Sequence, residues 1–162
     1  MTASYDPERD LTISRVIRAP RAAVWRAWTD PRQLEQWWVP APARSRVAEL
    51  DLQPGGAFES LISEDGGDFV PHVRFCFLAV DDQRRLVFTD ALTPGWRPAE
   101  QSFLTAVITL EDHPEGTRYA AHAMHKTPGD RKTHEDLGFY DGWGTVAEQL
   151  AKLVEQGEQE AW

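Results

Sequence analysis

Apolar and polar residues alternate in seven stretches of the chain, a period that predicts β-strands. In the first stretch, residues 10–20, Leu11, Ile13 and Ile17 fall on one face with polar residues between them. Six further stretches follow at residues 44–52, 56–64, 69–80, 85–92, 101–112 and 117–124. Short turns such as QPGG, EDGGD and HPEG join most of them, and TPGWRPAE forms a longer loop. Consecutive strands with short turns predict an antiparallel meander.

Two short helices are predicted between the first and second strands. The first, residues 20–30, carries its apolar residues on one helical face. Asp30 is a favourable N-cap and Pro31 a favourable first helical residue, so a second helix is expected over residues 31–38.

A longer helix is predicted near the C-terminus, within residues 134–154. Apolar residues recur there every three or four positions: Tyr140, Trp143, Ala147, Leu150 and Val154. Gly138, Gly142 and Gly144 interrupt this pattern, although each helical Gly costs roughly 1 kcal/mol relative to Ala. We expect these small residues to permit a close approach to the sheet or to the short helices, with Trp143 filling or walling the gap.

These elements predict an α+β fold in which a curved antiparallel sheet buries its inner face against the long C-terminal helix. The length of 162 residues and an apolar content of 41% suit a single domain with one core. We therefore expect one domain over residues 1–162, with its core at about 10–155.

Charge and cysteine content exclude several classes of function. The net charge of −9, without a basic stripe, argues against nucleic acid and anionic membranes as partners. The single cysteine, Cys76, rules out an internal disulfide and lies in an apolar run, which predicts a buried side chain. The chain has no apolar run of roughly 20 residues, and its start is polar and acidic. A cytoplasmic location is predicted.

Three segments carry a family resemblance: IRAPRAAVWRAWTDPRQLEQWW, then DLQPGGAFE, then HEDLGFYDGWGTVAEQLAKL. Together and in this order they resemble the START-like helix-grip superfamily (SRPBCC), in the bacterial branch similar to the activator of the ninety-kilodalton heat-shock protein ATPase. The resemblance covers residues 10–155. It implies a seven-stranded antiparallel sheet wrapped around a long C-terminal helix, with a hydrophobic cavity between them. Such folds host unrelated activities, so the resemblance implies no catalytic residues.

Aromatic side chains are the strongest candidates for lining such a cavity, since small-molecule sites are mostly apolar. The expected ligand-binding residues are Trp28, Trp38, Phe58, Phe75, Phe77, Phe88, Phe103, Tyr119, His125, Phe139 and Trp143. His125 is included because it shares strand parity with Tyr119. The alternative is that these rings pack solidly and leave no cavity.

Metal and acid–base chemistry receive less support. His122 and His125 point to opposite strand faces, and no second cluster completes a metal site. His134 lies in the first turn of the last predicted helix and is expected at the surface or near the helix cap. Glu59 and Asp90 lie inside predicted strands, and either would be a candidate acid or base if it faced inward. No nucleophile motif or phosphate loop is present, so no cofactor is indicated.

The sequence therefore predicts a protein that binds a small hydrophobic ligand, aromatic or lipid-like, with nothing that requires catalysis. Two alternatives stay open. One is an enzyme of the polyketide cyclase or aromatase kind, and the other is a protein-binding module similar to a co-chaperone domain. Self-association as a homodimer also stays open.

Overall fold

The computed structural model describes residues 4–160 and contains the predicted α+β helix-grip fold. Residues 1–3 and 161–162 of the expected domain lie outside the described residues. The seven strands of the main sheet are β1 (Asp10–Ile17), β2 (Arg44–Leu50), β3 (Ala57–Ser63), β4 (Val70–Asp81), β5 (Arg85–Thr89), β8 (Thr105–His113) and β9 (Gly116–Met124). They pair antiparallel in the order β1-β9-β8-β5-β4-β3-β2, which confirms the predicted sheet.

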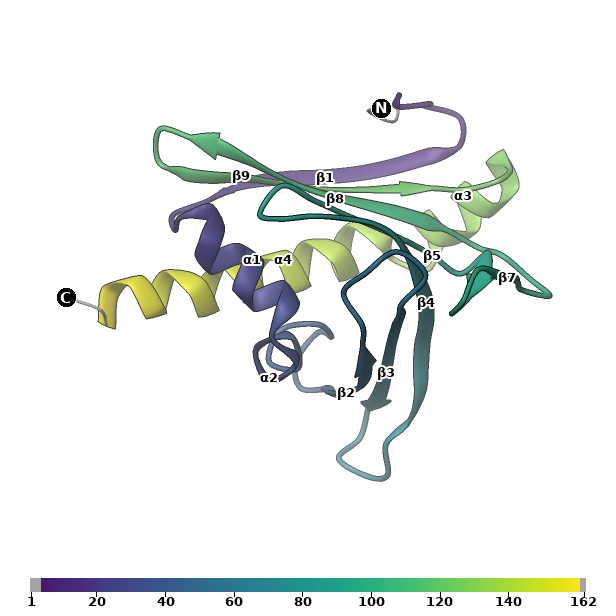
Figure 1. Cartoon of the computed structure of the whole chain (residues 1–162), viewed down its shortest axis with the longest axis horizontal. Coiled ribbons are helices and arrows are strands. Elements are labelled where there is room, and N and C mark those ends of the chain that lie inside the picture. The colour runs from purple at the N-terminus through teal and green to yellow at the C-terminus, as the bar shows by residue number, and fades with distance from the viewer. Residues whose placement is uncertain (1–3, 161–162) are drawn as a thin grey trace.

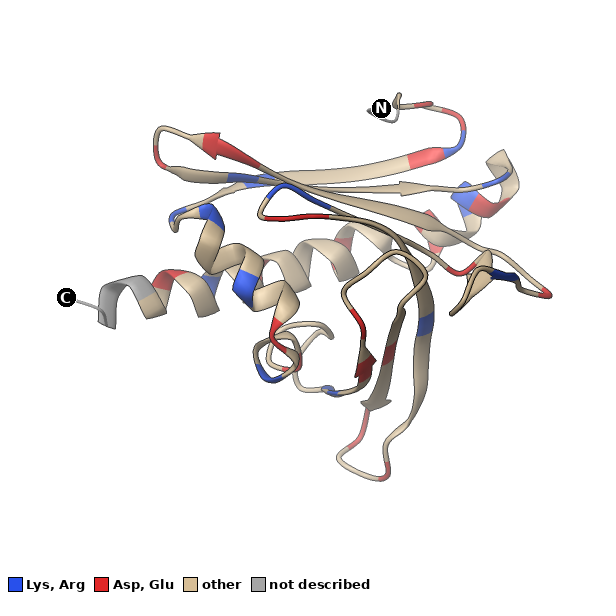
Figure 2. Ribbon diagram, in the orientation of Figure 1, with Lys and Arg blue, Asp and Glu red and all other residues tan. Residues whose placement is uncertain are grey.

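The sheet curves around the C-terminal helix α4 (Phe139–Glu160), and α1 (Arg21–Thr29) lies beside that helix (Figure 1). The face of α4 toward the sheet is apolar and buried, and it consists of Val146, Ala147, Leu150, Ala151 and Val154. Cys76 is fully buried, as predicted. Charged residues are spread over turns, strands and helices (Figure 2), and α4 itself carries the ion pair between Lys152 and Glu148. Within residues 4–160, no helix has the length and apolar character needed to span a membrane.

The second short helix, α2 (Pro31–Leu34), ends earlier than predicted. The chain turns after Leu34, and Trp37 and Trp38 are both buried in the core, at 1% and 8% exposure. The indole of Trp37 then donates a hydrogen bond to the carbonyl of Ala27 at 3.0 Å. That carbonyl lacks its helical partner because residue 31 is proline and has no N–H.

The C-terminal helix is not continuous over residues 134–154 as predicted. α3 (Pro128–Asp136) ends first, and α4 starts after a two-residue break. Gly138 forms the break with φ of 94°, a left-handed conformation that glycine adopts without steric cost. The break also turns Tyr140, which was expected on the apolar stripe, outward to 48% exposure. The inward rings at the start of α4 are therefore Phe139, which is 1% exposed, and Trp143.

The loop between β5 and β8 departs from the prediction in two ways. It contains a small hairpin, β6 (Leu92–Thr93) with β7 (Arg97–Pro98). In addition, β8 begins four positions later than the expected start at Gln101. The reason is the Asp90 carboxylate, which accepts hydrogen bonds from the backbone N–H groups of Phe103 and Leu104 at 2.8 and 3.1 Å and holds this segment outside the ladder.

Candidate functional site

A pocket of about 380 Å³ opens where the first turns of α4 face the ends of β3 and β4. We call it the α4 pocket. Its lining residues are Trp38, Val39, Pro40, Ile62, Glu64, His72, Val73, Phe75, Leu104, His134, Gly142, Trp143 and Val146. Most of these side chains are apolar, and three aromatic rings come from three different segments. The polar groups are confined to Glu64, His72 and His134.

The wall formed by residues 37–41 is tied to α4 by one side chain. Gln149 donates hydrogen bonds from Nε2 to the carbonyls of Trp37 and Val39, at 3.1 and 2.8 Å. Its Oε1 accepts a hydrogen bond from the N–H of Ala41 at 2.8 Å. A segment without regular structure thereby obtains partners for three backbone groups. Gln149 thus fixes the position of the wall that carries Trp38.

Gly142 provides the open side of the α4 pocket. A Cβ atom built there would meet no atom within 4 Å outside its own helix, and the same holds for Gly138 and Gly144. The expectation that these glycines permit a close approach is therefore wrong. Gly138 serves the helix break, whereas Gly142 faces the pocket and leaves it unfilled. Gly144 does not line the pocket.

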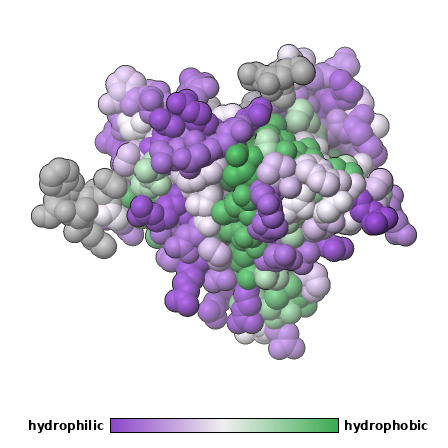
Figure 3. Space-filling view, in the orientation of Figure 1, coloured by the Kyte–Doolittle hydropathy of each residue, from purple (hydrophilic) through white to green (hydrophobic). Residues whose placement is uncertain are grey.

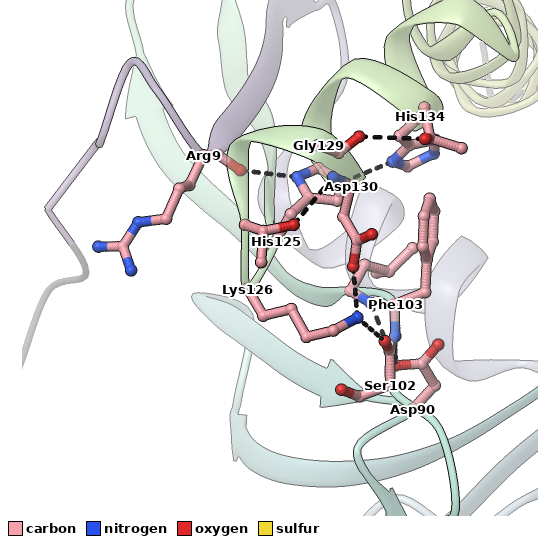
Figure 4. Close-up of polar contacts among 12 residues, drawn as sticks. Arg9, Asp90, Ser102, Phe103, His125, Lys126, Gly129, Asp130 and His134 are labelled. Carbon is pink, nitrogen blue, oxygen red and sulfur yellow. Dashed lines mark hydrogen bonds and ion pairs between the residues drawn. The ribbon is translucent and has the colours of Figure 1, made fainter.

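His134 lines the polar end of the pocket and is hydrogen-bonded to His125, which does not line it. His125, which follows β9 and is 5% exposed, places Nδ1 2.7 Å from the carbonyl oxygen of Arg9. Its Nε2 lies 2.8 Å from Nδ1 of His134 on α3 (Figure 4). The His134 ring packs against Phe103 and Phe139, with centroids 5.1 Å away in both cases. Burial, together with the neighbouring His125, lowers the pKa of His134 to about 4, so this ring is neutral at physiological pH.

Local sequence explains why His134 reaches this position. Thr127 caps α3 by accepting a hydrogen bond from the N–H of Asp130 at 3.0 Å, and Pro128 occupies the first turn. Lys126 pairs with Asp130 and donates to the carbonyl of Ser102 at 2.7 Å (Figure 4). These contacts attach α3 to the segment before β8. His134 therefore lies half-buried in the last turn of α3, close to the C-cap of that helix, where its ring reaches the pocket.

At the opposite rim, His72 is an exposed residue with Nδ1 3.4 Å from the hydroxyl oxygen of Ser60. The same hydroxyl accepts a hydrogen bond from the indole of Trp38 at 3.2 Å. Partial burial against the wall lowers the pKa of His72, and the Glu64 carboxylate opposes that shift. The rim therefore combines a neutral imidazole with an acidic side chain.

The eleven predicted ligand-binding residues fall into three groups. Trp38, Phe75 and Trp143 line the α4 pocket. Phe103, His125 and Phe139 surround His134 at its polar end. The remaining residues, Trp28, Phe58, Phe77, Phe88 and Tyr119, are at most 2% exposed and lie behind the pocket in the core. Contacts such as Phe58–Phe88, with centroids 5.4 Å apart and planes at 81°, show that this inner group packs ring against ring.

Neither of the two candidate strand carboxylates lines the α4 pocket. Asp90 holds the loop before β8, and Glu59 accepts a hydrogen bond from Arg74 at 2.9 Å. A second, larger pocket of about 660 Å³ lies around residues 18–22 and 112–116 and contains the ion pair between Arg21 and Asp112. Its lining comes mainly from the start of α1, the segment before it, and the hairpin between β8 and β9. Among residues 4–160, no group of three or more His, Cys, Asp or Glu side chains is arranged to hold a metal.

Residues 18–155 match the family model described as activator of Hsp90 ATPase homolog 1-like protein. The chain belongs to this family. The match agrees with the helix-grip fold and places the chain in the START-like superfamily. No curated protein matches the chain.

Solved structures agree with the family assignment. A crystal structure of a protein from Nitrosomonas europaea shares 43% identity with this family member, with a TM-score of 0.86, and the match covers 98% of this chain and 100% of that one. A protein from Mycobacterium smegmatis shares 25% identity, with a TM-score of 0.75 and coverages of 94% and 95%. An AHSA1-like protein from Aeromonas hydrophila, at 20% identity, a TM-score of 0.65 and coverages of 92% and 94%, supports the fold alone.

Proposed function

We propose that this protein binds a small, mostly apolar ligand in the α4 pocket. The observation that carries the proposal is the combination of an unfilled site at Gly142 with aromatic walls from Trp38, Phe75 and Trp143. A glycine inside a helix lowers stability, and here it leaves a space that a side chain would otherwise fill. The pocket volume lies within the range of small-molecule sites, and its lining has their usual apolar character.

The inner aromatic residues support this function indirectly. Because they pack solidly, they form a rigid back wall behind Trp38 and Phe75. Gln149 holds the remaining wall against α4. A pocket whose walls are already positioned binds with less loss of conformational entropy than one that must be ordered by its ligand.

A thermal-shift screen tests the proposal with fatty acids, flavonoids, sterols and aromatic polyketides. A ligand at 100 times its dissociation constant adds about 2.7 kcal/mol to the free energy of unfolding. For a chain of this size that corresponds to a rise in Tm of roughly 5–11 °C. Quenching of Trp fluorescence provides the second readout, since two indoles line the pocket.

Two matched variants locate the binding. Gly142→Leu places a side chain in the pocket, whereas Gly144→Leu makes the same change on the same helix outside it. We expect the shift to disappear in Gly142→Leu and to persist in Gly144→Leu. Equal shifts in both variants, or no shift with any compound, would contradict the proposal.

An enzyme of the cyclase or aromatase kind is the second candidate. One observation favours it, namely that a hydrogen-bonded histidine pair lies at the end of the pocket. An imidazole that is neutral at pH 7 and lines an apolar pocket is able to act as a general base. Turnover of a bound polyketide, lost in His134→Asn, would establish this function, and binding without turnover would favour a carrier.

A further inference from the structure

The hydrogen-bond chain at the polar end of the α4 pocket has a direction. A carbonyl oxygen only accepts hydrogen bonds, so the contact between Arg9 and His125 requires a proton on Nδ1 of His125. A neutral imidazole carries one N–H, which leaves Nε2 of His125 as an acceptor. Its partner at 2.8 Å, Nδ1 of His134, must then be the donor (Figure 4).

Because the single N–H of a neutral His134 is on Nδ1, its Nε2 is unprotonated and can accept a hydrogen bond. Among residues 4–160 this atom has no hydrogen-bond partner, and it is not one of the fully buried unpartnered atoms. His134 lines the α4 pocket, and Nε2 is the ring nitrogen that remains available for a ligand there. Its ring is held between Phe103 and Phe139, which restricts rotation away from this orientation.

We propose that the α4 pocket selects ligands that carry a hydroxyl group, which donates a hydrogen bond to Nε2 of His134. His125 is the positioning residue, because its bond to Arg9 determines which nitrogen of His134 is free. The chemical class is that of phenols and similar neutral alcohols on an apolar body, whose carbon skeleton contacts Trp38, Phe75 and Trp143. This inference rests on the proposed function, since it concerns the same pocket.

Competing groups do not reverse the direction of the chain. The only other titratable side chains that line the pocket are Glu64 and His72, on the opposite wall. Neither of the two hydrogen-bond partners of His125 is a carboxylate that would hold a second proton on its ring. With Nδ1 of His125 donating to the carbonyl of Arg9 and Nε2 of His125 accepting, the chain runs from His134 to His125 to Arg9.

Two matched pairs of probes separate this inference from the proposed function. They are 2-naphthol with 2-methoxynaphthalene, and 4-phenylphenol with 4-methoxybiphenyl, titrated calorimetrically at pH 8. Each ether has nearly the shape of its alcohol but cannot donate a hydrogen bond. We expect each alcohol to bind about two- to tenfold more tightly than its ether, the ratio that corresponds to one neutral hydrogen bond. Equal affinities would overturn the inference and leave the proposed function intact, whereas no binding of either pair would count against both.

The variant His134→Asn removes the free acceptor selectively. An Asn side chain amide can occupy the place of Nδ1 and still donate to His125, but it has no atom at the position of Nε2. We expect the ratio of alcohol affinity to ether affinity to fall to about one in this variant, and a ratio that stays at its original value would overturn the inference. His113→Asn, at the end of β8 beside the larger pocket, is the matched control and should retain the preference.

A spectroscopic measurement on the unchanged protein needs no variant. Nitrogen NMR at pH 8 should show His134 protonated at Nδ1 and unprotonated at Nε2, with the same tautomer at His125. Addition of 2-naphthol should move the Nε2 resonance of His134, and addition of 2-methoxynaphthalene should leave it in place. A proton on Nε2 of His134 in the free protein would overturn the inference.

Discussion

Adding one methyl group at Gly142 should stabilise the protein while it narrows the α4 pocket. The N–H of Gly142 donates to the carbonyl of Gly138 at 2.8 Å, so residue 142 already has a helical hydrogen bond. A Cβ at this position would meet nothing within 4 Å, so no steric term offsets the gain in helix propensity. Gly142→Ala should therefore raise the free energy of unfolding by about 0.5–1 kcal/mol.

The control is Gly144→Ala, which makes the same change two residues later in α4 with equally open space. Urea denaturation of both variants should show gains of similar size, with an increase in Tm of roughly 1–4 °C. Ligand affinity should fall only in Gly142→Ala, because only residue 142 lines the pocket.

A loss of stability in Gly142→Ala beside a gain in Gly144→Ala would refute this reasoning. It would mean that a neighbouring group occupies the space beside residue 142. An unchanged affinity of Gly142→Ala for a ligand large enough to fill the pocket would show that residue 142 is not part of the binding site.

Three further changes test other parts of the structure. Gly138→Ala should lower the free energy of unfolding, measured in urea, by about 1–2 kcal/mol, because φ of 94° is strained for any residue with a Cβ. An unchanged free energy of unfolding would contradict the role of Gly138 in the helix break. Gln149→Ala leaves three backbone groups of residues 37–41 without their partner, so it should lower the free energy of unfolding by about 1–3 kcal/mol and speed amide exchange at Ala41. Unaltered exchange would show that other contacts hold this wall. Between pH 6.5 and about 4 the unfolded chain binds a proton at His134 that the folded chain does not, so the free energy of unfolding should fall as the pH falls through this window. In urea titrations over this pH range, His134→Asn should reduce the dependence of the free energy of unfolding on pH. An unchanged dependence would show that the folded state tolerates the charge.

The arrangement of strands and helices follows from local patterns that a sequence displays directly. Alternation in Leu11, Ile13 and Ile17 identifies a half-buried strand, and the register of β1 with β9 keeps all three on one face. The departures arise where a single side chain overrides the local pattern. Asp90 delays β8 by binding two backbone N–H groups, and the indole of Trp37 holds the turn after α2 by donating to the carbonyl of Ala27. Neither effect is visible before the tertiary partners are known.

The candidate site was predictable only in part, because depth in the fold is not a local property. Phe58 and Phe75 have the same chemistry and similar strand patterns, yet Phe75 lines the pocket and Phe58 lies behind it. His134 carried a signal that could have been used, since a glycine four residues later favours a helix end and a turn inward. Its hydrogen bond to His125 joins residues from different elements, which spacing alone does not reveal.

Surface properties bear on the alternative of a protein-binding module. A band of hydrophobic residues crosses the face in Figure 3, between hydrophilic regions. Binding of a small ligand in the α4 pocket makes a separate prediction about location, because the pocket is bounded by α4 and the ends of β3 and β4.

Chemical-shift mapping during titration with the tightest compound of the thermal-shift panel tests the central claim most directly. The account predicts saturable changes concentrated at Gly142, the indole N–H of Trp143, Ile62 and Val73, with little change around the larger pocket at residues 112–116. Changes centred on residues 112–116, or spread evenly over the surface, would contradict the claim that the α4 pocket is the binding site.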